Sequence, residues 1–299
     1  MSHFKFNLNV MGWNANGLES HCEELVNFLS NFKPKLSFIC IQETHLKSSS
    51  SLNIEGYNIL SNCRKDRRGG GTAILIDNLI PFRIIEPSND DIEYTEIETV
   101  LVDATSPLRI VSIYLPPNQK IDSIKLSSVF SDLNTVVVGD FNAKNPLWGS
   151  NIADARGNTV SKCLLENTNL VCLNTGEPTH LNVRNGSMSH LDLTFCSATL
   201  ASVSDWCVLD SNLGSDHYPT ITSIGKSVPC ISNASSSWNL SKADWDGFSS
   251  AIRAVLSVDF ISHFGTEDFF VEFSKKVVSA ALDHIPLHNT SSAVRRLPF

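Results

Sequence analysis

A short apolar run that ends in a glycine, an acid and an amide constrains this chain most. Residues 136–138 are all valine, and Gly139, Asp140, Phe141 and Asn142 follow them. The pattern predicts a buried strand that releases Asp140 at its end, with Asn142 one step further on the same side. Such positions often carry chemistry, because the sheet holds the backbone while the loop exposes the side chain. For an isolated segment, the alternative is a strand followed by an ordinary Asp/Asn turn.

The rest of residues 5–225 alternates strand-like and helix-like patterns. We expect helices at 21–32, 123–133 and 159–167. We expect strands at 6–13, 36–42, 57–61, 72–76, 82–85, 95–102, 108–114, 170–173, 190–195, 201–209 and 217–224. The strands between 57 and 114 have only short turns between them, which favours antiparallel pairing. Two similar halves therefore predict an α/β (α+β) fold in which two packed β-sheets are flanked by helices.

The composition changes after residue 226. Residues 227–237 are rich in serine and are predicted to form a linker. Helical patterns over 245–256 and 267–285 predict a small helical appendage in residues 238–299. The domain prediction is thus a main domain at 1–226, a linker at 227–237 and a helical segment at 238–299.

The overall charge gives no indication of a nucleic-acid partner, since the formal net charge is −8. One dense basic cluster precedes three glycines, and it contains Arg64, Lys65, Arg67 and Arg68. Cations beside glycines suit close approach to a phosphate backbone, and a solvated hairpin tip is the alternative.

Cysteine usage and the apolar runs bear on location. The eight cysteines include no C-x-x-C pair, so we expect small buried hydrophobes rather than disulfides or zinc ligands. Residues 1–6 do not have the pattern of a secretory signal, and no apolar run approaches the length of a membrane span. These features favour an intracellular protein of the cytoplasm or nucleus with no membrane partner.

Polar side chains that could carry chemistry follow or lie within the predicted strands. They are Asn14, Asn16, Glu43, Tyr114, Asp140, Asn142, Asp192, Asp216 and His217. Each alone has an ordinary explanation as a turn, cap, core or strand-end residue. Together they predict a pocket of oxygen ligands that suits Mg²⁺, with Mn²⁺ as a possible substitute. The chemistry that this set of residue types favours is hydrolysis of a phosphate ester.

Six short motifs occur in a fixed order along residues 5–225. They are Trp13-Asn14-Ala15-Asn16-Gly17-Leu18, Ile41-Gln42-Glu43-Thr44, Ile113-Tyr114-Leu115-Pro116-Pro117, Gly139-Asp140-Phe141-Asn142-Ala143, Ser189-His190-Leu191-Asp192-Leu193 and Gly214-Ser215-Asp216-His217-Tyr218-Pro219. This ordered set resembles the endonuclease/exonuclease/phosphatase superfamily. Residues 142–150 and 154–157 are similar to the apurinic-type endonuclease domain of jockey-like non-LTR retrotransposons. Trp238-Asn239 with residues 242–245 resembles the segment that lies between nuclease and reverse transcriptase in such elements.

The resemblance implies a four-layer sandwich and a divalent-metal-dependent endonuclease that nicks double-stranded DNA. The nick would carry a 3′-hydroxyl, which primes reverse transcription in such elements.

It also implies a role for each motif residue. Glu43 would be the main Mg²⁺ ligand, with Asn14, Asn16 and Asp216 in the metal region. Asp140 would activate the attacking water, with Asn142 beside it. Tyr114 and His217 would contact the scissile phosphate, and Asp192 would orient His217.

Two positions depart from the superfamily pattern. Asn16 stands where cellular repair enzymes carry an aspartate, which puts a second metal ion in doubt. His190 stands where an aliphatic residue is usual, and we expect only local repacking there.

Other readings remain open at the level of the sequence. A phosphatase or phosphodiesterase of the same fold would use similar residues. A decayed element product that binds DNA without cutting it is a further alternative. The chain has no reverse transcriptase signature, so no polymerase activity is expected of these residues.

Overall fold

The computed structural model describes residues 7–64, 69–86, 92–100, 107–130, 134–167, 169–225, 237–238, 242–255 and 266–288. The chain divides into two units, Met1–Cys230 and Ile231–Phe299. The division falls inside the serine-rich segment at 227–237.

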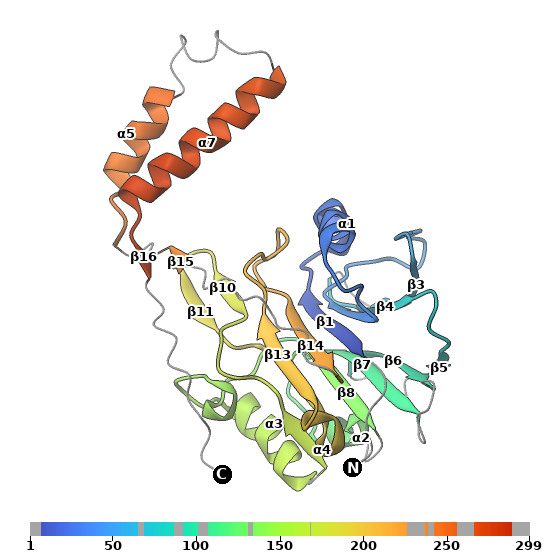
Figure 1. The fold of residues 1–299 in the computed structure, drawn as a ribbon. Coiled ribbons are helices and arrows are strands. Elements are labelled where there is room, and N and C mark those ends of the chain that lie inside the picture. Colours follow the sequence, from blue (N-terminus) through green and yellow to red (C-terminus); the bar gives the residue numbers. More distant parts are fainter. Residues whose placement is uncertain are drawn as a thin grey trace. The chain divides into compact units, whose positions relative to one another are not determined.

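The first unit is built on two six-stranded sheets (Figure 1). The first sheet has the order β13 (Ser204–Val208), β14 (Thr220–Ile224), β1 (Leu8–Asn14), β2 (Phe38–Gln42), β4 (Thr72–Asp77) and β3 (Tyr57–Asn62). The second has the order β5 (Arg83–Ile85), β6 (Glu93–Thr99), β7 (Leu108–Tyr114), β8 (Thr135–Asp140), β12 (Asp192–Ser197) and β9 (Leu170–Cys172). Two central pairs, β1–β2 and β7–β8, are parallel, and every other pair in these sheets is antiparallel.

A helix connects the strands of each parallel pair, because parallel neighbours need a crossover. The short η1 (Leu18–His21) and α1 (Cys22–Asn31) lie between β1 and β2, and α2 (Ser123–Val129) lies between β7 and β8. Asp122 caps α2 by accepting hydrogen bonds from the backbone N–H groups of Ile124 at 2.9 Å and Lys125 at 3.3 Å. The two halves of the unit therefore repeat the same strand–helix–strand motif.

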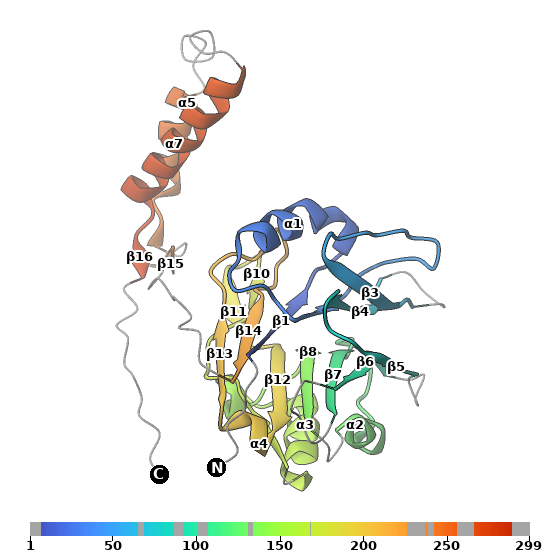
Figure 2. The same cartoon turned by 45° about the vertical axis from the view of Figure 1, so that its right-hand side comes forward.

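The layers follow from where the apolar side chains are buried. One core cluster, which includes Val10, Phe38, Ile110 and Val136, fills the space between the two sheets. A second cluster lies between the first sheet and α1, and a third lies between the second sheet and the helices α2 and α3 (Ala155–Glu166). Figure 2 shows this succession of helix, sheet, sheet and helices. The predicted fold of two packed sheets flanked by helices is thus confirmed.

Two local predictions were wrong, and one element was missed. Helix α3 begins at Ala155 rather than Thr159, because Asp154 caps it through the backbone N–H of Gly157 at 2.6 Å. Residues 198–201 form the short helix α4 (Ala198–Ala201), so the strand expected from residue 201 starts only at Ser204. A hairpin of β10 (His180–Asn182) and β11 (Ser187–Ser189) was not predicted.

The second unit contains two helices and a two-stranded ribbon. Helices α5 (Trp245–Val255) and α7 (Thr266–His284) match the two predicted helical segments closely. The strand β15 (Ser237–Trp238) precedes α5, and β16 (Leu287–His288) follows α7; the two strands pair antiparallel.

Cysteines and membrane propensity can be checked in the described part of the chain. Cys22, Cys40, Cys63, Cys163, Cys172 and Cys196 are free thiols, as the sequence suggests. Cys207 is disulfide-bonded, so that expectation was wrong for this residue. None of the described helices combines the length and the hydropathy needed to span a bilayer.

Candidate active site

The predicted site residues meet at one edge of the two sheets. The parallel strands β1, β2, β7 and β8 all end there, at Asn14, Gln42, Tyr114 and Asp140. The antiparallel strand β12 starts at the same edge, and Asp192 is paired in register with Asp140. Asp192 thus begins its strand, whereas the sequence pattern placed it inside one. The edge collects polar side chains from both sheets because the strand directions bring these ends together.

Asn14 connects the two sheets at this edge. Its Nδ2 donates to Glu43 Oε1 at 3.0 Å and to Asp140 Oδ2 at 2.9 Å, and the asparagine is fully buried. Its Oδ1 accepts from the backbone N–H of Asn16 at 3.0 Å. One amide therefore holds an acid of the first sheet next to an acid of the second.

Asp140 is buried yet well supplied with hydrogen bonds. Oδ1 accepts from the backbone N–H of Asn142 at 2.8 Å, and Oδ2 accepts from Asn142 Nδ2 at 2.9 Å as well as from Asn14. Burial raises the pKa of Asp140 to about 7, although the cationic His217 opposes this change. Asp140 can consequently exchange a proton near neutral pH.

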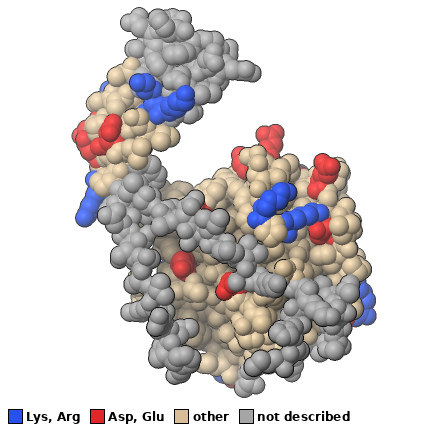
Figure 3. All heavy atoms as spheres, viewed as in Figure 1, with Lys and Arg blue, Asp and Glu red and all other residues tan. Residues whose placement is uncertain are grey.

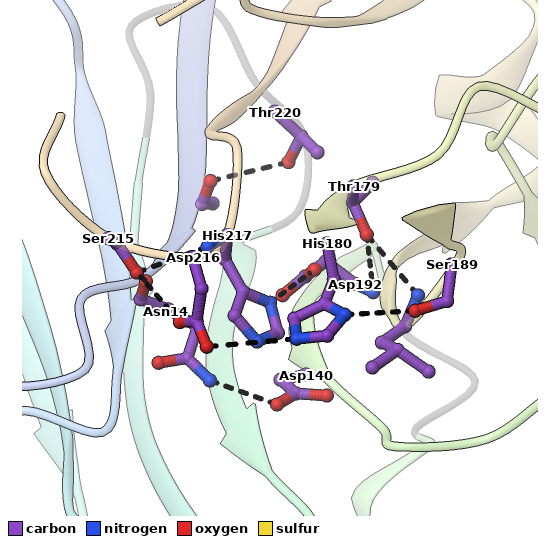
Figure 4. A network of polar contacts seen from close by, with 12 residues as sticks. Asn14, Asp140, Thr179, His180, Ser189, Asp192, Ser215, Asp216, His217 and Thr220 are labelled. Atoms are coloured by element: carbon purple, nitrogen blue, oxygen red, sulfur yellow. Dashed lines mark hydrogen bonds and ion pairs between the residues drawn. The ribbon is translucent and has the colours of Figure 1, made fainter. Parts of the chain in front are cut away.

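Asp192 and His217 form a buried pair. His217 Nδ1 lies 2.8 Å from Asp192 Oδ2, and both side chains are 7% exposed (Figure 4). Burial alone would lower the pKa of His217, but Asp192, Asp140 and Asp216 together raise it to about 10. The imidazole is therefore a cation at neutral pH that can donate a hydrogen bond through Nε2. Asp192 Oδ1 has no hydrogen-bond partner among the described residues.

Asp216 precedes His217 in the loop before β14 (Thr220–Ile224). It accepts a hydrogen bond from Asn16 Nδ2 at 3.3 Å, and His180 Nε2 lies 3.7 Å from its Oδ2. The contact with His180 is the main reason that the pKa of Asp216 is lowered to about 2. Ser215 ties this loop to β1, because its hydroxyl donates to the backbone oxygen of Asn14 at 2.7 Å.

Strained backbone gathers at the site. Five non-glycine residues of the described chain have positive φ, and three of them are the predicted site residues Asn16, Glu43 and Asn142, with φ of 45°, 48° and 46°. Such conformations cost free energy and persist only where the surroundings enforce them.

Arg156 enforces the conformation of the loop that carries Asn142. Its guanidinium donates to the backbone oxygens of Asn142 at 2.8 Å, Phe141 at 2.8 Å and Leu115 at 2.9 Å, and also to that of Gln119. Four carbonyls from two loops are therefore held by a single side chain.

Tyr114 and Arg64 complete the wall beside Glu43. Tyr114 is buried, and burial chiefly raises the pKa of its phenol, with the charges of Glu43 and Asp140 adding to the effect, so the phenol remains protonated. The Arg64 guanidinium lies 5.8 Å from the centre of the Tyr114 ring and forms an ion pair with Glu93. Arg64 thus supports Tyr114 instead of standing free in solvent.

The other three residues of the predicted basic cluster, Lys65, Arg67 and Arg68, lie outside the described residues. On the face of the first unit shown in Figure 3, the lysines and arginines drawn in blue form separate small groups.

The oxygen donors near Glu43 match the preferences of Mg²⁺. The set contains the carboxylates of Glu43 and Asp216 and the amide oxygens of Asn14 and Asn16, all of which are hard ligands. The Glu43 side chain is 23% exposed, and that of Asp216 is 29% exposed, so an ion can reach both from solvent. The chemistry of the donor set therefore fits a divalent cation of the Mg²⁺ or Mn²⁺ type.

Sequence reasoning missed four residues of this network. His180 comes from the unpredicted hairpin, and Thr179 accepts from the backbone N–H of Asp192 at 3.1 Å. Ser215 lies within a recognised motif, so its neighbours Asp216 and His217 could have drawn attention to it. Arg156 lies in the predicted loop before the third helix, and only the tertiary structure reveals the carbonyls that it binds.

Known proteins provide a family match and two relatives of similar sequence. Residues 108–221 match a family described as endonuclease-reverse transcriptase. A probable RNA-directed DNA polymerase from transposon X-element of Drosophila melanogaster is 26% identical over 227 residues, which cover 73% of this chain and 24% of that protein. The RNA-directed DNA polymerase from mobile element jockey of Drosophila funebris is 28% identical over 173 residues, which cover 56% of this chain and 18% of that protein.

A solved structure extends the comparison to the fold. The endonuclease domain of TRAS1, a telomere-specific non-LTR retrotransposon, superposes with a TM-score of 0.61 at 22% identity, covering 73% of this chain and 98% of that domain. These matches confirm the resemblance drawn from the six motifs. The chain spans about a quarter or less of the length of the two polymerases that it matches.

Proposed function

We propose that this chain is a divalent-metal-dependent endonuclease that nicks double-stranded DNA by hydrolysis and leaves a 3′-hydroxyl. In a non-LTR retrotransposon, that hydroxyl would prime reverse transcription. One observation carries the proposal: the buried Asp192–His217 pair and the Asn14–Glu43–Asp140 network share one strand edge. A cation, a proton acceptor and a set of oxygen ligands are thereby assembled around one site. The similarity to retrotransposon endonucleases supports DNA as the substrate and an intracellular location.

Glu43, Asn14, Asn16 and Asp216 would hold the metal ion. Once bound, Mg²⁺ or Mn²⁺ would neutralise charge on the scissile phosphate and on the leaving oxygen. The low pKa of Asp216 supports this assignment, since its carboxylate is ionised at neutral pH. The Glu43 carboxylate is partly exposed and can be reached by an ion.

Asp140 is the group that we assign to the water. Its pKa of about 7 suits a base that accepts a proton from water near neutral pH, and Asn142 holds its carboxylate in place. The water oxygen bonds to phosphorus while the P–O3′ bond breaks. The departing oxygen keeps the electron pair and takes up a proton, which yields the 3′-hydroxyl and a 5′-phosphate.

His217 and Tyr114 are assigned to the phosphate oxygens. The protonated imidazole can donate through Nε2 because Nδ1 is engaged by Asp192, which fixes the orientation of the ring. The phenol of Tyr114 remains protonated and can donate as well. Both donors stabilise the charge that develops on the phosphoryl group.

A plasmid assay tests the proposal. Supercoiled plasmid should be converted to the open circle in Mg²⁺ and should stay supercoiled in EDTA. Glu43→Ala and Asp140→Ala should each reduce the nicking rate by about 10²–10³-fold or more. Glu166→Ala, which removes an exposed acid of α3, is the matched control.

Calorimetry with Mg²⁺ then separates the two roles. Glu43→Ala should lose most of its affinity for the ion, whereas Asp140→Ala should largely retain it. If both variants cut at the wild-type rate, the site assignment is wrong.

The ends of the nick test the polarity of hydrolysis. A DNA polymerase should extend the nicked strand with labelled nucleotide without prior phosphatase treatment. A blocked 3′ end would contradict the proposal. A plasmid that stays closed while a small phosphate ester is hydrolysed would favour the phosphatase alternative. Binding of DNA without any cleavage would favour the decayed product.

A further inference from the structure

A cluster of two histidines and an aspartate shares Asp216 with the proposed Mg²⁺ ligands. It consists of His180 from the hairpin strand β10 with Asp216 and His217 from the loop before β14. One ligand atom from each residue lies within 4.8 Å of the other two, and His180 Nε2 is 3.7 Å from Asp216 Oδ2. The two imidazole centres are 4.6 Å apart, and Figure 4 shows the rings side by side. Nothing in the proposed hydrolysis uses His180.

Both histidines are held through their Nδ1 atoms. His217 Nδ1 lies 2.8 Å from Asp192 Oδ2, and His180 Nδ1 lies 2.9 Å from Ser189 Oγ. Histidines that bind metals typically engage their second ring nitrogen in this way, because the contact fixes the tautomer and orients the ring. Each histidine of the cluster thus has Nε2 as the nitrogen that remains for a metal, and at His217 the metal takes the place of the proton that Nε2 otherwise carries.

The backbone fixes the histidines relative to each other. Residues 180 and 217 form an antiparallel bridge, the backbone N–H of Leu181 donates to Asp216 O at 2.8 Å, and that of Tyr218 donates to Thr179 O at 2.7 Å. A tetrahedral metal with bonds of about 2.0–2.2 Å needs its ligand atoms about 3.3 Å apart. The contact of 3.7 Å is close to that spacing, and the other two separations, within 4.8 Å, reach it by rotation of the side chains.

The donors select a different metal from Mg²⁺. Two imidazole nitrogens and one carboxylate are typical ligands of zinc, whereas Mg²⁺ prefers oxygen and binds imidazole poorly. His180 and Asp216 keep 19% and 29% of their side chains exposed, so an ion can enter from solvent. Three protein ligands would leave the fourth position to water.

We propose that His180, Asp216 and His217 form a binding site for Zn²⁺, and that an ion bound there inhibits DNA nicking. Inhibition follows because zinc would occupy the Nε2 atom that His217 would otherwise direct at the phosphate, and would also take Asp216. The inhibition rests on the proposed endonuclease function, while zinc binding does not.

Zinc binding is tested directly on the full chain after removal of metals with EDTA. Zn²⁺ alone is titrated against a colorimetric zinc chelator, and His180→Asn should bind one equivalent fewer than the wild type. Ser189→Ala should retain that equivalent with about 10–100-fold lower affinity. The variant keeps His180 as a ligand but removes the contact that orients its ring. Excess Mg²⁺ should not displace the ion.

His284→Asn is the matched control. It removes a histidine that also contacts an aspartate, with Nδ1 3.3 Å from Asp244 Oδ2, but the described residues place no second histidine in that contact. Its zinc binding should equal that of the wild type. Co²⁺ in place of Zn²⁺ should give a spectrum without thiolate charge-transfer bands, which excludes the free cysteines as ligands.

Zinc binding that is equal in the wild type, His180→Asn and His284→Asn would overturn the site. The second readout is nicking in Mg²⁺ with increasing Zn²⁺, each variant being normalised to its own rate without zinc. Inhibition should require at least about tenfold more Zn²⁺ in His180→Asn. If the wild type binds zinc at this site but never nicks plasmid, the zinc site is supported and the endonuclease function is refuted. If Zn²⁺ inhibits nicking by the wild type and by His180→Asn at the same concentration, zinc bound at this site is not the cause of the inhibition.

Discussion

At the scale of single residues, the site depends on a histidine kept charged by its neighbours. His217 is almost completely buried, and burial of this kind favours the neutral ring. Asp192 contributes most to reversing that preference, through a direct hydrogen bond at 2.8 Å and through its charge. The charge of His217 is therefore a property of the pair.

Replacement of Asp192 by asparagine tests this dependence. In the metal-free protein, Asp192→Asn should lower the pKa of His217 by at least about one unit, which NMR titration of the imidazole can follow. Because the folded-state pKa lies above the unfolded value of 6.5, the pair stabilises the fold fully below pH 6.5, and that stabilisation disappears as the pH rises through about 10. The difference in unfolding free energy between the wild type and Asp192→Asn should therefore become smaller as the pH rises from 6.5 to about 10.

Asp205→Asn is the matched control, since Asp205 is an exposed carboxylate on β13. It should leave the pKa of His217 unchanged. An equal pKa of His217 in Asp192→Asn and in the wild type would show that other groups hold the charge.

At the scale of elements, the parallel contact between β7 and β8 aligns Tyr114 with Asp140. Gly139 makes this contact possible, because a Cβ atom at this position would lie 1.8 Å from the backbone oxygen of Ile113. Backbone cannot move aside as a flexible side chain can. A methyl group there must push the two central strands of the sheet apart.

Gly139→Ala should therefore destabilise the fold by about 1–3 kcal/mol or more, as overpacking of a tight core does. Urea unfolding of the purified variant measures this loss. Gly186→Ala at the tip of the β10–β11 hairpin is the control, since its Cβ meets nothing within 4 Å, although φ is +69°. Only the strain of a positive φ, about 1 kcal/mol, should remain there. Equal losses in the two variants would disprove the steric argument.

Elements with long apolar patterns were the ones that the sequence predicted well. The valines before Gly139 form a central strand that is buried on both faces, which explains why the run is continuous rather than alternating. The strands β10 and β11 are short and mostly polar, so they leave no such pattern, and His180 was overlooked for this reason. Residues 198–201 form a short helix, although the sequence on both sides of them has a strand pattern.

The site itself was predictable only in part. Glu43, Asp140 and His217 stand at the ends of recognisable strands, so their types and order pointed to one pocket. The pairing of Asp192 with Asp140, and the clamp made by Arg156, arise from contacts between segments far apart in the chain. No local pattern encodes those contacts.

At the scale of the whole molecule, the two units differ in how much core they possess. The three core clusters consist entirely of residues between Leu8 and Ile224, all within the first unit. The described buried side chains of the second unit are Ala280 and Ile285. The free energy that holds the sheets together therefore comes from the first unit.

A chain of residues 1–230 should consequently fold and function without the rest. Its thermal unfolding should be a single cooperative transition with a midpoint within a few degrees of the main transition of the full chain, because no core cluster is cut. It should also retain nicking of supercoiled plasmid in Mg²⁺. Residues 231–299 alone should unfold with little cooperativity, since a segment of this size rarely supplies enough core. If circular dichroism shows the shortened chain to be unfolded, the second unit stabilises the first. If the shortened chain is folded but no longer nicks plasmid, the second unit is required for binding of the DNA.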